Sequence, residues 1–109
     1  MSNEGGTKFD GEKARVELLS PIALIELSKV LTFGAKKYGD HNWRGGFRSS
    51  RLLGAILRHV LAYLGGETRD PESGLSHIAH AMAGCMFLLE QEKTKPDLDD
   101  RYNNEKKST

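Results

Sequence analysis

An apolar stripe in the middle of the chain constrains the fold most. Its members lie three and four residues apart, and they are Leu52, Leu53, Ile56, Leu57, Val60, Leu61 and Leu64. This spacing is typical of a helix face that packs against a core. Gly65 and Gly66 follow the last member and end the pattern. We therefore predict an α-helix over 50–64 whose leucine side faces the protein core.

A second helix is predicted over 21–38. Ser20 is a good N-cap, and Pro21 suits the first helical position because its missing N–H costs nothing there. Gly39 is typical of a C-terminal stop. Between these signals, apolar residues recur at helical spacing at Leu24, Leu27, Val30, Leu31 and Ala35. The local signals and the periodicity thus agree on both ends of this helix.

A third helix is predicted over 70–91. Asp70 followed by Pro71 has the pattern of an N-cap and a first-position proline. The expected buried side carries Leu75, Ile78, Met82, Met86 and Leu89. No part of the sequence shows sustained alternation of apolar and polar residues, the period that indicates a strand. The predicted fold class is therefore all-α, a small helical bundle of three main helices.

Both ends of the chain are polar, and we expect neither to join the core. Such sequences bury too little surface to offset the cost of ordering them. We predict a flexible arm over 1–15, a helical domain over 16–92 and a disordered polar tail over 93–109. A core of this small size supplies only about 3–5 kcal/mol, so we expect help from a metal or from a partner chain.

The first predicted helix is apolar on more than one side, because Ile22, Ile25 and Phe33 lie outside its main stripe. A helix that is apolar nearly all round is a buried helix. Bundles usually need four or more helices to enclose a core, so this chain has too few to cover it alone. We therefore predict that homo-oligomerisation completes the bundle, as a dimer or a tetramer of closed symmetry.

Positive charge is concentrated in one part of the chain. The net charge is only +1, but between 29 and 59 seven lysines and arginines accompany the single acid Asp40. Such a field suits a polyanion, either a small phosphate compound or a nucleic acid. The basic residues form no recognised nucleic-acid motif, so we expect no stable nucleic-acid partner.

The remaining composition favours a soluble, cytoplasmic protein. Cys85 is the only cysteine, which excludes an internal disulfide and suits a reducing compartment. We find no apolar run of the ~20 residues that a membrane span requires, and therefore expect no membrane partner. The polar first residues do not resemble the core of a signal peptide.

Imidazoles and carboxylates gather near the start of the third predicted helix. His77 and His80 are three residues apart on one helix face, a spacing that suits a shared metal or phosphate. Glu67 and Asp70 lie just upstream, and Glu26 stands in the middle of the first predicted helix. Mixed oxygen and nitrogen ligands suit Mg²⁺, Mn²⁺ or Co²⁺. We predict that these residues bind a divalent metal and that Glu67 and His80 take part in catalysis.

A further set of residues is predicted to bind a substrate, because lysine and arginine neutralise phosphate charge and an aromatic ring can stack on a base. The set is Lys36, Lys37, Tyr38, Trp43, Arg58 and His59. Trp43 belongs to the short loop 39–47, which also carries histidine and arginine between glycines. Loops that hold rings and charges at the surface are often functional.

Several of these residues also have a structural interpretation, which the sequence leaves open. Asp70 before a proline makes an N-cap, and Glu26 can pair with Lys29 three residues further on. Trp43 can fill the core. His59 lies near the end of a predicted helix, where an imidazolium is stabilised whatever its function.

Dispersed blocks of the sequence match a known family in one order. The blocks cover 8–10, 18–21, 30–40, 42–44, 58–59, 66–67 and 70–81. The sequence resembles the phage dATP/dGTP diphosphohydrolases, which belong with the MazG-like all-α nucleotide pyrophosphohydrolases. The resemblance implies a divalent-metal enzyme that cleaves a purine deoxynucleoside triphosphate to the monophosphate and pyrophosphate. It also implies an active site built within a helical oligomer.

The sequence departs from the MazG-like pattern in its acidic residues. Larger MazG-like enzymes hold metal with E-x-x-E and E-x-x-D motifs, whereas the first predicted helix here offers only Glu26 and the third has His77-x-x-His80. One alternative is a metal shell rebuilt around these histidines with Glu67 and Asp70. The other is a protein that binds or sequesters nucleotides without cleaving them. An HD-type phosphohydrolase is disfavoured, because no histidine is followed directly by aspartate.

Overall fold

The computed structural model describes residues 5–102, and the fold it gives is all-α, as predicted. The three main helices are α1 (Pro21–Tyr38), α2 (Ser49–Leu64) and α3 (His77–Thr94). Three short 3₁₀ helices accompany them, namely η1 (Val16–Leu18), η2 (Asn42–Gly45) and η3 (Pro96–Leu98). The described residues contain no strand, only an isolated bridge between Arg69 and Ser76. None of the helices within 5–102 has the length and apolar character needed to cross a membrane.

The helix α1 has the bounds that the sequence predicts, because local signals fix both ends. The Ser20 hydroxyl accepts a hydrogen bond from the Ala23 amide at 3.1 Å, and Pro21 occupies the first position. At the other end Gly39 has φ of 99°, a conformation that favours glycine, and its amide donates to the Ala35 carbonyl.

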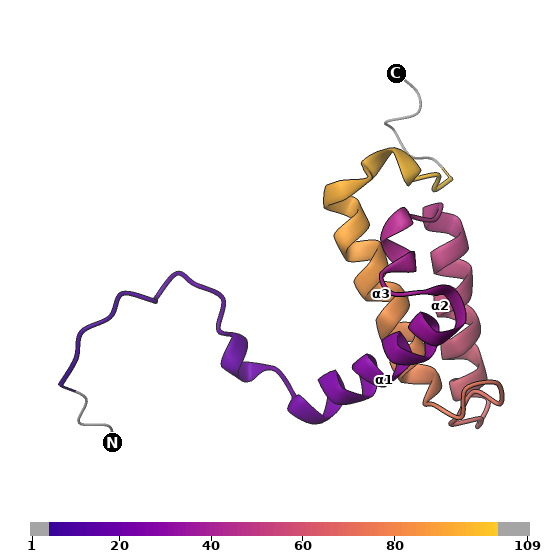
Figure 1. The fold of residues 1–109 in the computed structure, drawn as a ribbon, viewed down its shortest axis with the longest axis horizontal. Helices are drawn as coiled ribbons and strands as arrows, with labels where there is room; N and C mark the ends of the chain where they lie inside the picture. The colour runs from indigo at the N-terminus through magenta and orange to yellow at the C-terminus, as the bar shows by residue number, and fades with distance from the viewer. Residues whose placement is uncertain (1–4, 103–109) are drawn as a thin grey trace.

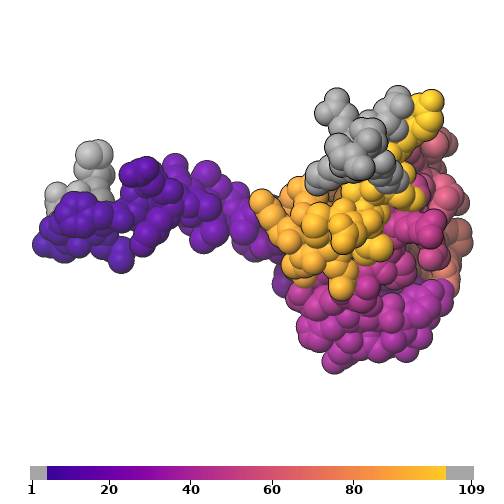
Figure 2. Space-filling view, turned by 90° about the horizontal axis from the view of Figure 1, so that it is seen from above, coloured from indigo at the N-terminus to yellow at the C-terminus, as the bar shows by residue number. Residues whose placement is uncertain are grey.

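The helices α2 and α3 lie side by side, and α1 crosses them at one end (Figure 1). The core forms where α1 meets α3, from buried Leu27 and Val30 of α1 and buried Ala79 and Ala83 of α3. Small residues on α3 let the helices approach closely. The first part of α1 and the residues before it extend away from this packed region (Figures 1 and 2).

The start of α3 differs from the prediction, because the helix begins at His77 rather than at 70. Asp70 is not its N-cap. The Asp70 amide donates to the Leu75 carbonyl, and the Asp70 carboxylate accepts from the Glu72 amide, so 70–75 closes as a turn. Ser76 caps α3 instead, with its hydroxyl accepting from the Ile78 amide. The turn therefore leaves Asp70 beside the helix rather than on its axis.

The leucine stripe of α2 also differs from the prediction, because only part of it faces the core. Leu52 and Ile56 are buried, but Leu57, Leu61 and Leu64 are exposed by 56, 61 and 79%. The stripe is wide, and α3 covers only one edge of it. Ile22, Ile25 and Leu89 are exposed as well, so several large apolar side chains on all three helices have no cover from the described residues.

The described part of the predicted polar tail, 93–102, contacts the bundle. The helix α3 continues to Thr94, two residues past the predicted domain end at 92. Asp100 then accepts hydrogen bonds from both the amide and the hydroxyl of Ser50, at the start of α2. Residues 103–109 of that tail, and 1–4 of the predicted arm, lie outside the described residues.

Candidate functional site

Two helices and the loop between them place His59, Asp70 and His80 in one cluster. His59 comes from the second half of α2 and His80 from the first turn of α3, which the antiparallel packing brings together. Asp70 comes from the turn that joins the helices. Each of these residues offers one ligand atom, and the atoms all lie within 4.8 Å of one another. Among residues 5–102, this is the one such group of three or more histidine, cysteine or acidic side chains.

The cluster favours uncharged histidines. Partial burial lowers the pKa of His59, and the neighbouring His80 lowers it further. Partial burial is also the main cause that lowers the pKa of His80, although the Asp70 carboxylate opposes it. A neutral imidazole keeps a lone pair on one nitrogen, which is the form that binds metals. Asp70 adds a carboxylate that is 19% exposed, so the donor set fits a divalent cation.

Packing fixes the orientation of the two imidazole rings. The rings of His59 and His80 are stacked, with centroids 4.6 Å apart and planes 9° from parallel. Phe33 of α1 meets the His80 ring edge-on at 6.4 Å. The Ser73 hydroxyl lies 2.7 Å from His80 Nε2, and the Asp70 carboxylate lies 3.6 Å from the same nitrogen. All three helices therefore contribute to holding His80.

Glu67 and His77, both predicted ligands, lie beside the cluster rather than in it. His77 Nε2 is 2.7 Å from the Glu67 carboxylate, and His77 Nδ1 is 2.9 Å from His59 Nδ1. Both ring nitrogens of His77 are thus engaged. The fifth predicted ligand, Glu26, forms an ion pair with Lys29 at 2.8 Å, which is the structural alternative that the sequence leaves open.

Some of the predicted substrate-binding residues lie close to the cluster. Lys37, at the end of α1, forms an ion pair with Glu72 in the turn that carries Asp70. This hydrogen bond raises the pKa of Lys37, so the side chain is positively charged. The Lys37 ammonium also lies 5.3 Å from the ring centre of Tyr38, which is 63% exposed. Lys36 and Arg58 are exposed as well.

Trp43 is placed differently, because its ring packs within the protein. It stacks on Phe87 of α3 with centroids 4.7 Å apart and planes 16° from parallel. The Arg44 guanidinium lies 4.4 Å from the same ring, and it forms an ion pair with Glu90 at 2.6 Å. Phe87 and Arg44 both lie against the Trp43 ring, which is only partly exposed. This geometry favours the structural interpretation of Trp43 over base stacking.

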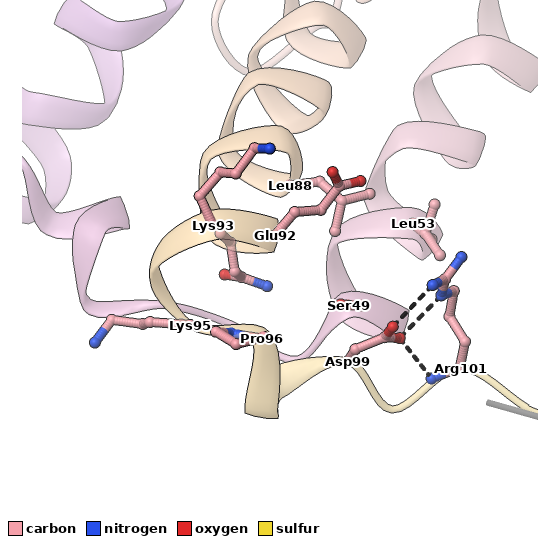
Figure 3. A pocket seen from close by; sticks show the side chains of 10 residues that line it. Ser49, Leu53, Leu88, Glu92, Lys93, Lys95, Pro96, Asp99 and Arg101 are labelled. Carbon is pink, nitrogen blue, oxygen red and sulfur yellow. Dashed lines mark hydrogen bonds and ion pairs between the residues drawn. The ribbon is translucent and has the colours of Figure 1, made fainter. Parts of the chain in front are cut away.

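A pocket of about 320 Å³ lies away from the cluster, where α3 ends near the start of α2 (Figure 3). Ser49, Leu53, Leu88 and Pro96 contribute to its lining, and Asp99 and Arg101 form an ion pair at its edge. None of the residues predicted from the sequence to bind metal or substrate lines it. Its charges are mixed, so it offers no field for a polyanion.

The sequence analysis misses the roles of two residues at the site, His59 as a member of the candidate metal cluster and Ser73 as a hydrogen-bond partner of His80. His59 is predicted to bind substrate, yet it lies seven residues after Leu52 and three after Ile56, in the phase of the buried edge of α2. That phase was a usable signal. Ser73 gives no such signal, because a serine in a short polar loop has no periodic context.

The fold and the site together define a small all-α domain with a candidate divalent-metal centre between two antiparallel helices. The family described as dATP/dGTP diphosphohydrolase, N-terminal, matches residues 3–101. The chain belongs to this family, and the resemblance seen in the sequence is confirmed. A dATP/dGTP diphosphohydrolase of Salmonella phage PMBT28 is 43% identical over 96 residues, which are 88% of this chain and 33% of that protein. The chain thus spans about a third of the length of the curated relative that it matches. No solved structure matches.

Proposed function

We propose that this chain acts in the metal-dependent hydrolysis of purine deoxynucleoside triphosphates, dATP or dGTP, to the monophosphate and pyrophosphate. The observation that carries the proposal is the convergence of His59, Asp70 and His80 within 4.8 Å in a half-buried cluster. The family and the name of the phage relative support the substrate class. In this reaction water adds to the α-phosphorus, and the bond to the bridging oxygen breaks as pyrophosphate leaves.

The donor set favours Mn²⁺ or Co²⁺ over Mg²⁺, because imidazole suits transition metals better than it suits magnesium. Such an ion, when bound, supplies hydroxide at neutral pH by lowering the pKa of a bound water. The chain's own contribution is to hold two neutral imidazoles and one carboxylate in a fixed arrangement. The stacked rings and the edge contact from Phe33 restrict the motion of His80, which keeps the donor atoms close together.

The positive residues near the cluster are the groups we assign to the phosphates. Glu72 directs the Lys37 ammonium toward the turn that carries Asp70, so this charge lies on the cluster side of α1. Lys36 and Arg58 are exposed and add further positive charge. Tyr38 keeps an exposed ring and takes over the base-stacking role predicted for Trp43.

Pyrophosphate release measured for each of the four deoxynucleoside triphosphates tests the proposed function. We expect release from dATP or dGTP with Mn²⁺ or Co²⁺, slower release with Mg²⁺, and none with EDTA, because the hydroxide depends on the metal. Tight binding of nucleotide without pyrophosphate release would support the alternative of a nucleotide-binding protein. If the protein neither binds nucleotide nor releases pyrophosphate with any of these metals, both functions are excluded.

We also propose that the protein is a homodimer or a larger homo-oligomer. The exposed leucines of α2 and the exposed isoleucines of α1 support this, since a second copy offers apolar faces of the same kind. The expected result is a solution mass of at least twice 12.1 kDa by sedimentation. The double substitution Leu57→Glu and Leu61→Glu should reduce that mass, because it places charge in the apolar face. A stable, folded monomer of the unaltered protein would contradict the proposal.

A further inference from the structure

A chain of three side chains leads from the protein surface to the candidate metal site. It begins at Glu67, whose carboxylate is 54% exposed and lies 2.7 Å from Nε2 of His77. His77 is almost fully enclosed, with 6% of its side chain exposed. Its second nitrogen, Nδ1, lies 2.9 Å from Nδ1 of His59. His59 is the member of the cluster that the chain reaches, and its ring stacks on His80.

The hydrogen-bonding capacity of each group fixes where the protons lie. A carboxylate only accepts hydrogen bonds, so Nε2 of His77 must carry the hydrogen that it donates to Glu67. When the His77 ring is neutral, its Nδ1 is an acceptor, and Nδ1 of His59 must then donate to it. A neutral His59 with its hydrogen on Nδ1 has its lone pair on Nε2. That nitrogen is therefore the one left for a metal.

We propose that Glu67 and His77 are positioning residues that hold His59 in the tautomer with a free Nε2 lone pair. This inference rests on the proposed metal site, but it assigns Glu67 and His77 a role different from the ligand role that their sequence positions predict. Neither residue donates an atom to the cluster. Metal-binding histidines commonly have the other ring nitrogen bound to a polar partner, which fixes the tautomer and the ring orientation. Here that partner is a second histidine, backed by a carboxylate.

The tautomer of His59 can be measured without any metal or turnover. Long-range ¹H–¹⁵N NMR of the ¹⁵N-labelled, metal-free chain near neutral pH separates protonated from unprotonated ring nitrogens. In the unaltered protein we expect His59 to carry its hydrogen on Nδ1 and to show an unprotonated Nε2. Glu67→Gln keeps an amide oxygen that can accept from His77, so it should retain most of this tautomer. Glu67→Lys offers only donors, which reverses the direction of the chain.

Glu67→Lys should therefore move the hydrogen of His59 from Nδ1 to Nε2. The affinity for Co²⁺, measured by titration calorimetry, should fall by roughly ten- to a hundred-fold, as is typical when a partner of a metal-binding histidine is lost. Thr68→Lys is the matched control, because it places the same lysine side chain at the exposed neighbouring residue. It should leave the His59 tautomer unchanged and weaken Co²⁺ binding much less.

Three results would overturn the inference. The first is an Nε2-protonated His59 in the unaltered metal-free protein. The second is an unchanged His59 tautomer in Glu67→Lys. The third is a Glu67→Gln variant that loses as much Co²⁺ affinity as Glu67→Lys while its His59 tautomer is unchanged, since that result would make Glu67 a ligand. The NMR result is independent of hydrolysis, so failure of the proposed function and failure of this inference are distinguishable.

Discussion

Replacing His80 with alanine is expected to abolish the binding of Mn²⁺ and Co²⁺ and, with it, pyrophosphate release. The cluster offers only three protein ligand atoms, and removing one imidazole leaves too few to hold a divalent ion firmly. Partners of a metal-binding histidine are worth about ten- to a hundred-fold in affinity, so loss of a direct ligand should cost at least about a hundred-fold. Titration calorimetry and a pyrophosphate assay measure the two effects separately.

The chain provides a matched control in His41. This histidine is exposed, lies outside the cluster and has φ of 61°, a conformation that asparagine tolerates. His41→Asn therefore removes an imidazole without straining the backbone, and metal affinity should stay within about twofold of the unaltered value. Circular dichroism establishes whether His80→Ala is folded. A folded His80→Ala variant with unchanged affinity for Mn²⁺ and Co²⁺ would place the metal elsewhere.

The sequence predicts helices best where their ends are fixed by local interactions. The bounds of α1 are confirmed because the Ser20 cap and the Gly39 stop act within a few residues of their own positions. The prediction for the start of α3 is wrong for a related reason. Asp70 before proline is a strong local signal for an N-cap, but the backbone bond between Asp70 and Leu75 closes a turn instead. The residues around Asp70 can form either a helix N-cap or a turn, and sequence periodicity does not show which of the two is more stable.

The candidate site was predictable only in part, because it combines positions from two helices and a loop. The three-residue spacing predicts correctly that His77 and His80 lie on one side of α3. It does not predict that His77 binds His59 and Glu67 while His80 joins the cluster, because this depends on the register of α2 against α3. The same limit applies to Trp43. Its partner Phe87 is 44 residues away, so the sequence could not decide between the base-stacking and the core interpretation of Trp43.

The register of α2 against α3 depends on one close contact between the two helices. A substitution at this contact is expected to have a large effect on stability and on the cluster. Gly84 of α3 lies against Ile56 of α2, and a Cβ atom at Gly84 would be 2.6 Å from Cγ1 of Ile56. Ile56 is buried, so its side chain has little room to move. A side chain at 84 would therefore push the two helices apart. Because His59 follows Ile56 by one turn, the same displacement would separate His59 from His80.

Gly84→Val is expected to lower the free energy of unfolding by about 3 kcal/mol, the upper end of the usual cost of overpacking. This would remove most of the stability of so small a core, which is about 3–5 kcal/mol. Urea unfolding followed by circular dichroism measures the loss. In the absence of urea, the folded fraction of the variant should also bind Co²⁺ more weakly, because the donor atoms of the cluster no longer lie close together.

Gly34→Val is the control for replacing a helical glycine. Gly34 lies within α1. Apart from its chain neighbours and the backbone of its own helix, no heavy atom among residues 5–102 lies within 4 Å of a Cβ atom placed there. The change should be neutral or slightly stabilising, since valine favours a helix more than glycine does.

Ile56→Ala should cost less in the Gly84→Val background than in the unaltered protein, because the smaller side chain relieves the overlap. A Gly84→Val variant that unfolds at the same urea concentration as the unaltered protein would show that α2 and α3 do not pack in this register, and the His59–His80 cluster would then lose its structural basis.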